Sequence, residues 1–385
     1  MGISRRTFIQ AVGGTGLALV GVGGTFAATR TPNRALLPWE ELDNARPADV
    51  RLDAFRHAIL APNPHNRQPW LIQLVGQDRA VIFCDLDRRL PQTDPFDRQI
   101  LIGIGCFLEI ARIAAAQRGV SMETVPFPEG FSAERLDRRP IASLRFAATG
   151  TATKDPLFSA IPNRRSNKQP FDTARSVETS VLDMLMAHRS PQAEIGTSVD
   201  AALVRRLRTL TWDAWNTEFV TRRTWQESVD LMRIGRKEID THPDGISIGG
   251  PFLEALAMVG QLSREQLARP GTMAYSAGAD RYRPIMASSM GYAWITTPGN
   301  SRTEQLAAGR AFVRMNLEAA RQGLGFHPVS QALQEFSEMA KSFGDVHATL
   351  SAPQGARIQM LARLGYGSVA TKTPRWPLAS RLIGA

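Results

Sequence analysis

Two short polar segments contain residue types that could bind a cofactor. The first, residues 61–70, reads Ala-Pro-Asn-Pro-His-Asn-Arg-Gln-Pro-Trp, and its prolines favour a rigid loop between a helix and a strand. Each asparagine amide in such a loop offers both a hydrogen-bond donor and an acceptor, which suits the edge of a heterocycle. The alternative is an ordinary Asn/Pro turn that binds nothing.

The second segment, residues 162–171, places three cations around one hydroxyl group. Arg164, Arg165 and Lys168 flank Ser166. Arginine forks, a lysine charge and a hydroxyl are the groups that proteins use to bind a phosphate. A solvated basic run is the alternative interpretation.

Helices and strands must position these segments, and the spacing of apolar residues predicts both. Helices are expected over 51–60, 99–118 and 304–322, and strands over 70–75, 80–86, 141–146, 292–297 and 358–364. Helices are also expected to dominate from 178 to 270. This mixture, with long sequence separations, favours an α+β fold over a doubly wound sheet.

One internal repeat is suggested by two amphipathic helical patterns. Gly105, Ala115-Ala116 and Gly119 recur as Gly309, Ala319-Ala320 and Gly323, at an offset of 204 residues. The terminal glycines fit left-handed helix caps, and the small residues predict two buried helices that approach closely. Coincidence is the alternative, since Ala-rich helices ending in glycine are common. The repeat would divide the chain into halves at 29–150 and 151–385.

Residues 1–28 resemble a twin-arginine export signal. Arg5 and Arg6 precede a Gly-rich apolar stretch, and cleavage is expected after Ala27. We therefore expect export by the twin-arginine machinery to the periplasm, with only transient membrane contact. The alternative is an uncleaved membrane anchor. No later stretch is expected to be long and apolar enough to span a bilayer.

Composition excludes several classes of protein. The chain has 385 residues, 43% of them hydrophobic, so a disordered chain is excluded. The net charge is +10, but the 41 arginines are scattered, and no nucleic-acid partner is expected. Cys84 and Cys106 cannot form a disulfide framework or a four-thiolate zinc site, and both are expected as buried free thiols. No metal site is predicted.

Together with residues 323–331 and 364–377, the two polar segments resemble the FMN-dependent nitroreductase family, and most closely its exported, fused-repeat (Acg-like) branch. The resemblance covers about residues 50–380. It implies a nitroreductase-like α+β fold, with a central, mostly antiparallel sheet flanked by helices and two fused half-repeats forming a pseudo-dimer. One loop motif and one basic motif imply one FMN per chain.

The resemblance also implies where the FMN would bind. Arg164 and Arg165 would pair with its phosphate, Ser166 would touch the ribityl–pyrimidine side, and Lys168 would lie near N1 and O2. The remaining contacts would come from Pro62, Asn63 and Asn66 across the interface between halves, from backbone groups of Pro328, Val329, Ser330 and Gln331 at flavin N5 and O4, and from Arg375 at the phosphate. No side chain is assigned as catalytic.

A long segment at about 220–303 has no counterpart in the simplest family members. It could be a lid over the flavin, lined by Met290, Tyr292 and Trp294. The alternative, slightly favoured, is a helical packing insert.

The implied activity is that of an FMN-dependent oxidoreductase. Two electrons would pass through flavin N5 to a quinone, a nitroaromatic or a similar small-molecule acceptor. Cytoplasmic family members take hydride from NAD(P)H, whereas an exported protein could use a quinol or a redox protein as donor. The alternative is a flavin-binding protein that sequesters FMN without turnover.

A distant third hypothesis is a serine hydrolase. The segment Gly245-Ile246-Ser247-Ile248-Gly249 matches the nucleophile-elbow pattern. That elbow follows an apolar strand, whereas the preceding residues 236–244 are strongly charged, which argues against it.

Overall fold

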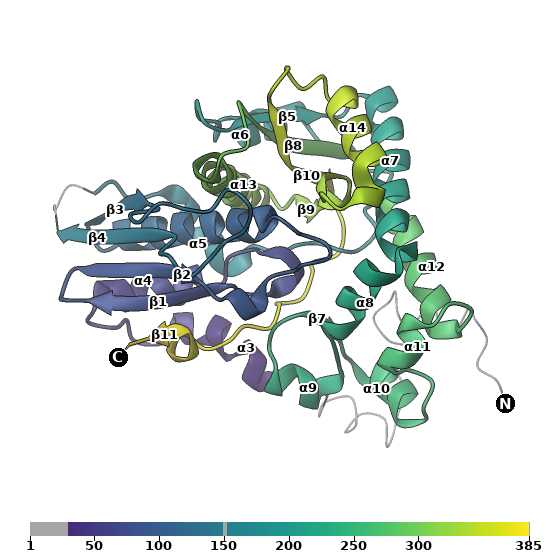
Figure 1. Ribbon diagram of the computed structural model, residues 1–385, viewed down its shortest axis with the longest axis horizontal. Helices are drawn as coiled ribbons and strands as arrows, with labels where there is room; N and C mark the ends of the chain where they lie inside the picture. The colour runs from purple at the N-terminus through teal and green to yellow at the C-terminus, as the bar shows by residue number, and fades with distance from the viewer. Residues whose placement is uncertain (1–29, 149–151, 385) are drawn as a thin grey trace.

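The structure is a computed structural model that describes residues 30–148 and 152–384. The predicted signal segment 1–28 therefore lies outside the described residues. Helices pack between and around two separate, almost wholly antiparallel sheets (Figure 1). This confirms the α+β class, although the described residues form two large sheets and one parallel two-stranded sheet where one central sheet was expected.

The first sheet is built mainly from the first part of the chain. Its strands have the order β11-β1-β2-β4-β3. The elements are α4 (Val50–Ala58), β1 (Trp70–Val75), β2 (Arg79–Cys84), α5 (Arg98–Ala116), β3 (Val120–Pro126), β4 (Ala142–Ala148) and, from the C-terminus, β11 (Leu382–Ile383). β11 runs parallel to β1, with Leu382 opposite Ile72, and the other pairs are antiparallel.

The second sheet has the order β5-β8-β10-β9 and is antiparallel throughout. Its elements are α6 (Thr179–Met186), β5 (Glu194–Ser198), β8 (Gly291–Thr297), α13 (Arg302–Arg321), β9 (Gly325–Pro328) and β10 (Arg357–Gly365). Apart from β11, the two sheets have the same strand order. When the four strands of each sheet are numbered along the chain, the first, second, fourth and third lie side by side. In each case the long helix, α5 or α13, follows the second strand and precedes the third in the sequence.

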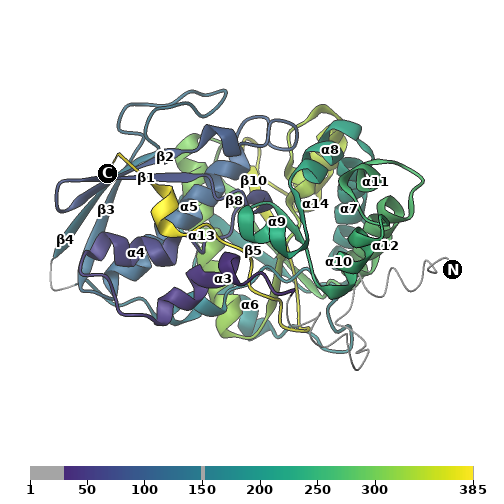
Figure 2. The same ribbon diagram turned by 90° about the horizontal axis from the view of Figure 1, so that it is seen from below.

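The two long helices α5 and α13 pack against each other at the centre of the molecule (Figures 1 and 2). Gly105 and Gly309 lie at their contact. Ser301 and Glu304 form a capping box at the start of α13. Gly119 and Gly323 follow the two helices with φ of +69° and +62°, as the predicted left-handed caps require.

Helix α5 is long and apolar enough to cross a membrane, judged by length and composition alone. The expectation that no stretch after residue 28 has this character is therefore wrong. Of the apolar window, 89% is buried inside the protein, where Phe107 stacks on Trp70 and Phe55. α5 is thus the core helix of the first sheet.

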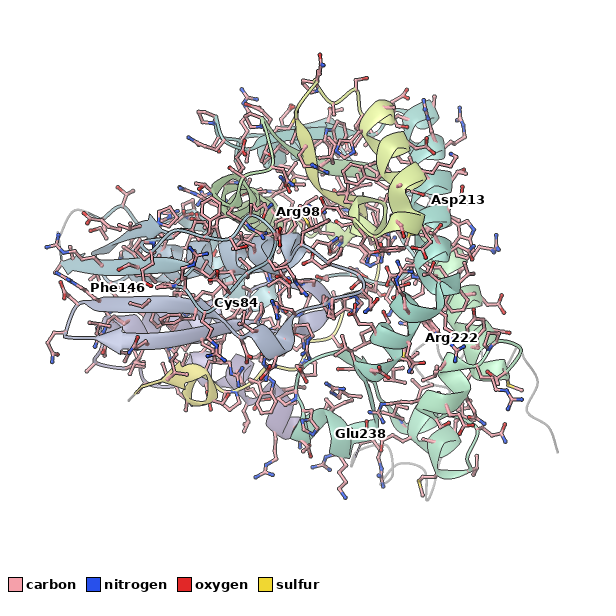
Figure 3. The ribbon with its side chains drawn as sticks, viewed as in Figure 1. Cys84, Arg98, Phe146, Asp213, Arg222 and Glu238 are labelled. Atoms are coloured by element: carbon pink, nitrogen blue, oxygen red, sulfur yellow. The ribbon has the colours of Figure 1, made fainter. Side chains whose placement is uncertain are left out.

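A mainly helical insertion lies between β5 and β8. It contains α7 (Ala201–Val220), α8 (Arg222–Asp230), β6 (Met232–Ile234), α9 (Gly235–Thr241), β7 (Ile246–Ile248), α10 (Pro251–Met258), α11 (Arg264–Ala268) and α12 (Met273–Ala287). It forms an outer layer to one side of both sheets, where Asp213 of α7 and Arg222 of α8 are labelled in Figure 3.

The bounds of this insertion differ from the expected 220–303. It begins at α7, and it ends before β8, because residues 291–297 are a sheet strand. Tyr292 and Trp294 therefore belong to the second sheet rather than to a lid, and the Tyr292 side chain is fully buried against Thr211 of α7.

Short elements complete the chain. They are α3 (Asn33–Glu40), α14 (Ala340–Thr349) and the 3₁₀ helices η1 (Glu41–Asp43), η2 (Pro64–Asn66), η3 (Leu86–Arg88), η4 (Pro156–Asn163), η5 (Ser330–Leu333), η6 (Ser337–Met339) and η7 (Leu378–Arg381). η2, η4 and η5 carry or adjoin the predicted site segments. Arg98 of α5, labelled in Figure 3, joins the first sheet to the second by donating to Gln359 and pairing with Glu335.

Candidate functional site

Two arginines from distant segments converge on the loop that follows α4, and a third arginine, next to the first in the sequence, lies over the ring of Trp39. The Leu60 carbonyl oxygen accepts hydrogen bonds from Arg164 (3.0 Å) and from Arg375 (3.1 Å). Both arginines are 2% exposed, and the Arg165 guanidinium lies 4.7 Å from the centre of the Trp39 ring. Within the described residues, no carboxylate pairs with any of the three. Buried positive charge of this kind is costly unless an anion joins it.

The electrostatics of this arginine triad fit a phosphate group. Burial, with a contribution from Arg165, lowers the pKa of Arg164 to about 10. Burial first, and then Arg164 and Arg165, hold the pKa of Arg375 well below its usual range. The Nε atom of each arginine is buried without a hydrogen-bond partner. A phosphate oxygen would satisfy such donors and neutralise the charge.

The predicted asparagine loop lies beside this triad. Asn66 Oδ1 accepts a hydrogen bond from Arg375 (2.5 Å), and Asn66 Nδ2 donates to the Pro374 carbonyl (3.0 Å). Asn63 Oδ1 accepts from the Gln68 backbone N–H (2.7 Å). Both amides therefore brace the loop and Arg375. Gly103 of α5 allows the loop to approach, because a Cβ there would lie 2.9 Å from the Asn63 Cβ.

The backbone on both sides of Lys168 is tied to the edge of the second sheet. The Asn167 N–H donates to the Phe326 carbonyl of β9 (2.8 Å). Arg363 of β10 donates to the carbonyl oxygens of Asn167 (3.2 Å) and Gln169 (2.6 Å). The segment is thus fixed while the Lys168 side chain stays exposed.

Two histidines near Lys168 are neutral at pH 7. Burial, with the charges of Lys168 and Arg67, lowers the pKa of His65 to about 4. Burial, with Arg363 and Lys168, holds the pKa of His327 well below its usual range. The His327 Nδ1 accepts from Arg363 Nε at 2.8 Å. Lys168 therefore presents its positive charge between the asparagine loop and β9.

The 328–331 segment is fixed by β10 and α5. The Val329 N–H donates to the Leu361 carbonyl (2.9 Å), so this N–H is not free to bind a ligand. The Ser330 hydroxyl bonds to both backbone groups of Leu361, and Gln99 of α5 donates to the Ser330 carbonyl (3.4 Å). Ser330 and Gln331 begin η5, where backbone N–H groups lack helical partners.

The insertion reaches the site through a buried carboxylate. Asp244 pairs with Arg67 (2.6 Å), Arg88 (3.1 Å) and Arg233 (3.1 Å). Arg67 belongs to the asparagine loop and Arg233 to β6, so this Asp244 clasp joins the loop to the insertion. The residues that were expected to line a lid do not make this contact. Asp244 makes it, from the connection between α9 and β7.

Gln68 joins the same loop to the C-terminal tail. Its side chain is fully buried, with Nε2 donating to the Pro243 carbonyl (2.7 Å) and Oε1 accepting from the Trp376 N–H (2.9 Å). Neither Gln68 nor Asp244 was predicted as a site residue. The contacts that join Gln68 to Pro243, and Asp244 to Arg67 and Arg88, span more than 150 residues of sequence.

The structure brings most of the predicted site residues together. The asparagine loop, the basic segment and Arg375 meet directly, and the basic segment runs on to β9 and Pro328 through Asn167. Among the residues that the structure describes, no side-chain hydrogen bond of Ser166 assigns it a role. A cavity of about 670 Å³ lies elsewhere, at α3, α9 and α10, and no predicted site residue lines it.

The hydrolase hypothesis finds no support in the geometry. Ser247 is an exposed residue in the middle of β7, opposite Arg233, and the next helix starts only at Pro251. A nucleophile elbow needs its serine at the strand-to-helix turn. Cys84 and Cys106 are both buried and unpaired, as predicted, and burial raises the pKa of each thiol.

In sequence, the chain is similar to proteins that are named as putative nitroreductases. No protein-family model matches the chain. The chain is 33% identical over 126 residues to "Putative NAD(P)H nitroreductase acg" of Mycobacterium tuberculosis, which is 32% of this chain and 36% of that protein. The chain thus matches only about a third of the length of this relative. It is 25% identical over 315 residues to a second M. tuberculosis protein, "Putative NAD(P)H nitroreductase Rv3131", covering 81% of this chain and 83% of that protein.

One solved structure aligns with part of the chain. The FMN-dependent nitroreductase NfnB from Mycobacterium smegmatis, solved with NADPH, aligns over 57% of this chain and 94% of its own, with 17% identity and a TM-score of 0.37.

Proposed function

We propose that this chain is an FMN-binding oxidoreductase of the nitroreductase class, with its two sheet halves forming a fused pseudo-dimer. The observation that carries the proposal is the arginine triad. The Leu60 carbonyl joins Arg164 and Arg375, and Arg165 lies over the same Trp39 ring as Arg375. Within the described residues, the three arginines have no carboxylate partner, and the Nε of each is unsatisfied. A structural role alone leaves this charge uncompensated.

The triad would hold the FMN phosphate, with Asn66 keeping Arg375 in place. Lys168, whose flanking carbonyls are held by Arg363, would supply a positive charge beside the flavin ring. A cation there stabilises the negative charge that reduction adds, and raises the reduction potential. The free N–H groups at the start of η5 would face the reactive edge of the ring.

Bound FMN would supply two-electron chemistry to a quinone, a nitroaromatic or a similar conjugated acceptor. The names of the relatives favour NAD(P)H as electron donor. Export by the twin-arginine route, proposed from residues 1–28, would instead favour a quinol or a redox protein. The asparagine loop of the first half and the basic segment of the second half would bind the same FMN. We therefore propose one FMN per chain.

The experiment is a visible absorption spectrum of the folded protein, followed by chromatography of the cofactor released by heat. We expect FMN at about one per chain, and bleaching of the bound flavin by dithionite. Full reconstitution with FMN at about two per chain would contradict the single-site proposal. Failure to bind any flavin would overturn the proposed function.

A further inference from the structure

Helix α10 of the insertion buries its charged residue and exposes apolar side chains. Seven of its eight residues, Pro251–Met258, are apolar, and the exception, Glu254, is only 7% exposed. Met258 is 73% exposed, and the following Val259 is 66% exposed. A helix on the surface of a globular protein normally has the opposite polarity, with its apolar side against the core. The exposed end of α10 thus has the character of a contact surface.

Two bonds hold the Glu254 carboxylate on the inner side of α10. It pairs with Arg30 (3.3 Å) and accepts a hydrogen bond from the backbone N–H of Arg236 in α9 (2.9 Å). α9 in turn is joined to α3, because the Asp240 carboxylate accepts from the Ala35 N–H (2.9 Å). The three helices therefore form one unit, and they lie next to one another along the lower edge of Figure 1.

The cavity of about 670 Å³ at these helices is basic. Four cations and two acids line it, which gives a net charge of +2, and both acids belong to ion pairs with arginines. Arg34 of α3 and Lys237 of α9 are exposed, and neither has an ion pair among the residues that the structure describes. Met258 lines the same cavity. Uncompensated positive charge therefore lies directly beside the exposed apolar end of α10.

The sequence before α3 connects this cavity to a segment directed to membranes. Arg30, which lines the cavity, follows the proposed export signal at residues 1–28 by two positions in the sequence. A secretory signal of this kind meets a bilayer during export. The first described residue of the chain therefore lies where the exposed apolar and basic side chains are found.

We propose that the end of α10 and the basic cavity form a docking face for a bilayer that contains anionic lipids. Met258 and Val259 would enter the outer part of the acyl layer, and Arg34 and Lys237 would contact lipid phosphates. An apolar surface flanked by cations is the pattern by which proteins bind the membrane interface. A free phosphate would engage only the cations, whereas an anionic bilayer engages both kinds of side chain.

Docking does not depend on the proposed flavin, since no residue of the docking face belongs to the candidate FMN site. Helix α3 connects the two. Trp39 of α3 lies under the Arg165 guanidinium, and Arg34 precedes it by about 8 Å along the helix axis. In the FMN-loaded protein, docking would bring the phosphate end of the site near the bilayer, within reach of a donor dissolved in lipid, such as a quinol. This consequence rests on the proposed function.

The first test attaches a fluorophore that is sensitive to its surroundings to the full chain. Val259→Cys carries it on the docking face, and Val125→Cys, at an exposed valine of β3, is the matched control. Cys84 and Cys106 are buried and should not react. With vesicles of phosphatidylglycerol and phosphatidylcholine, the emission should shift to shorter wavelength only at position 259. An unchanged spectrum at 259, or an equal shift at both positions, would overturn the proposal.

The second test measures co-sedimentation of the full chain with the same vesicles. Arg34→Gln with Lys237→Gln should weaken binding about 25-fold, because each cation near an anionic bilayer strengthens binding about fivefold. Arg145→Gln with Lys154→Gln is the control, since it removes the same charge from exposed positions elsewhere and should weaken binding much less. Met258→Glu should also weaken binding, because it places a negative charge on the apolar end of the face.

Three outcomes of these measurements would overturn the proposal. Equal binding by the natural chain and all variants would show that another part of the chain holds the vesicle. Release by millimolar inorganic phosphate at constant ionic strength would indicate a site for a free anion. No vesicle binding, together with a concentration-dependent mass that Met258→Glu abolishes, would identify a second copy of the chain as the partner.

The docking face and the proposed function can fail separately. The fluorescence and co-sedimentation measurements need no bound FMN, so a chain that binds no flavin contradicts the proposed function and leaves both tests intact. A chain that binds FMN but shows none of the expected vesicle effects contradicts only the docking face.

Discussion

Gly105 of α5 and Gly309 of α13 contact each other through their backbones, and the contact is reciprocal. A Cβ on Gly105 would meet the Leu306 carbonyl oxygen and lie 3.1 Å from the Gly309 Cα. A Cβ on Gly309 would meet the Ile102 carbonyl oxygen and lie 2.9 Å from the Gly105 Cα. Ile102 and Leu306 are separated by the same 204 residues as the glycines. A two-fold axis between copies of one helix produces this pattern, which supports the proposed pseudo-dimer.

Gly105→Ala should lower the free energy of unfolding by about 1–3 kcal/mol, because the new methyl group has no space at the helix contact. Gly344→Ala is the matched control, since Gly344 also lies in a helix but nothing lies within 4 Å of an added Cβ. It should raise the free energy of unfolding by about 0.5–1 kcal/mol. Chemical denaturation measures both. Equal stability of Gly105→Ala and the natural chain would contradict close helix packing.

Replacing Arg164 and Arg165 together with alanine should remove FMN from the purified protein. Each charge-assisted hydrogen bond to phosphate contributes about 1.5–3 kcal/mol, so binding should weaken about a hundredfold or more. Flavin fluorescence titration gives the dissociation constant. Arg145→Ala, at an exposed position of β4, should bind FMN normally. Full occupancy of the double variant would place the phosphate elsewhere.

Lys168→Ala should lower the reduction potential of bound FMN and retain part of the flavin. The variant removes the positive charge beside the ring but leaves the arginine triad intact. Spectroelectrochemistry on the loaded protein measures the shift. Lys154→Ala, at another exposed lysine, should leave the potential unchanged. A potential that does not move in Lys168→Ala would separate this lysine from the flavin ring.

Asp244→Asn should loosen the asparagine loop and speed FMN release. Breaking a buried ion pair by removing one partner costs about 3–5 kcal/mol, because charges are left unpaired. Here three arginines lose their shared carboxylate. Stopped-flow fluorescence after dilution measures the release rate. Asp137→Asn, in an exposed pair with Arg139, is the control that should change neither rate nor stability. An unchanged release rate in Asp244→Asn would show that the clasp does not support the site.

His65 should make the folded state less stable in mild acid. Its pKa is about 4 in the folded protein and about 6.5 when unfolded, so the unfolded chain binds more protons between these values. The free energy of unfolding of the natural chain, minus that of His65→Asn, should therefore fall as pH falls from about 6.5 towards 4. Asparagine tolerates the left-handed backbone at this position, where φ is +45°. Denaturation of both proteins across this range measures it, and a pH-independent difference would contradict a lowered pKa of His65 in the folded protein.

The elements that the sequence predicted well are those with strong local periodicity. The two long helices, the hairpin from Trp70 and the strand near Tyr292 lie within a few residues of their expected bounds. β5 was missed inside a region expected to be helical, because Glu194–Ser198 is short and weakly apolar. The start of the insertion was missed because α7 follows β5 without a change in composition.

The site was predictable as a set of segments but not as a network. Asn66, Arg164 and Arg375 could be named from motifs. In the structure Arg164 and Arg375 both donate to Leu60, and Asn66 accepts from Arg375. Asp244 and Arg363 could not be named. In a sequence, an isolated acid or arginine within a helix or strand pattern predicts a surface residue, and only the fold shows that it is buried.

The C-terminal tail contributes Arg375 to the triad, and its last strand, β11, pairs with β1 near the start of the fold. Ribosomes deliver Arg375 only after β1 to β10 and the insertion have been made. The phosphate-binding end of the site cannot be complete before that point of synthesis. Cofactor capture would then come late in synthesis or after it, and a product that ends before Arg375 should fold without its proposed flavin.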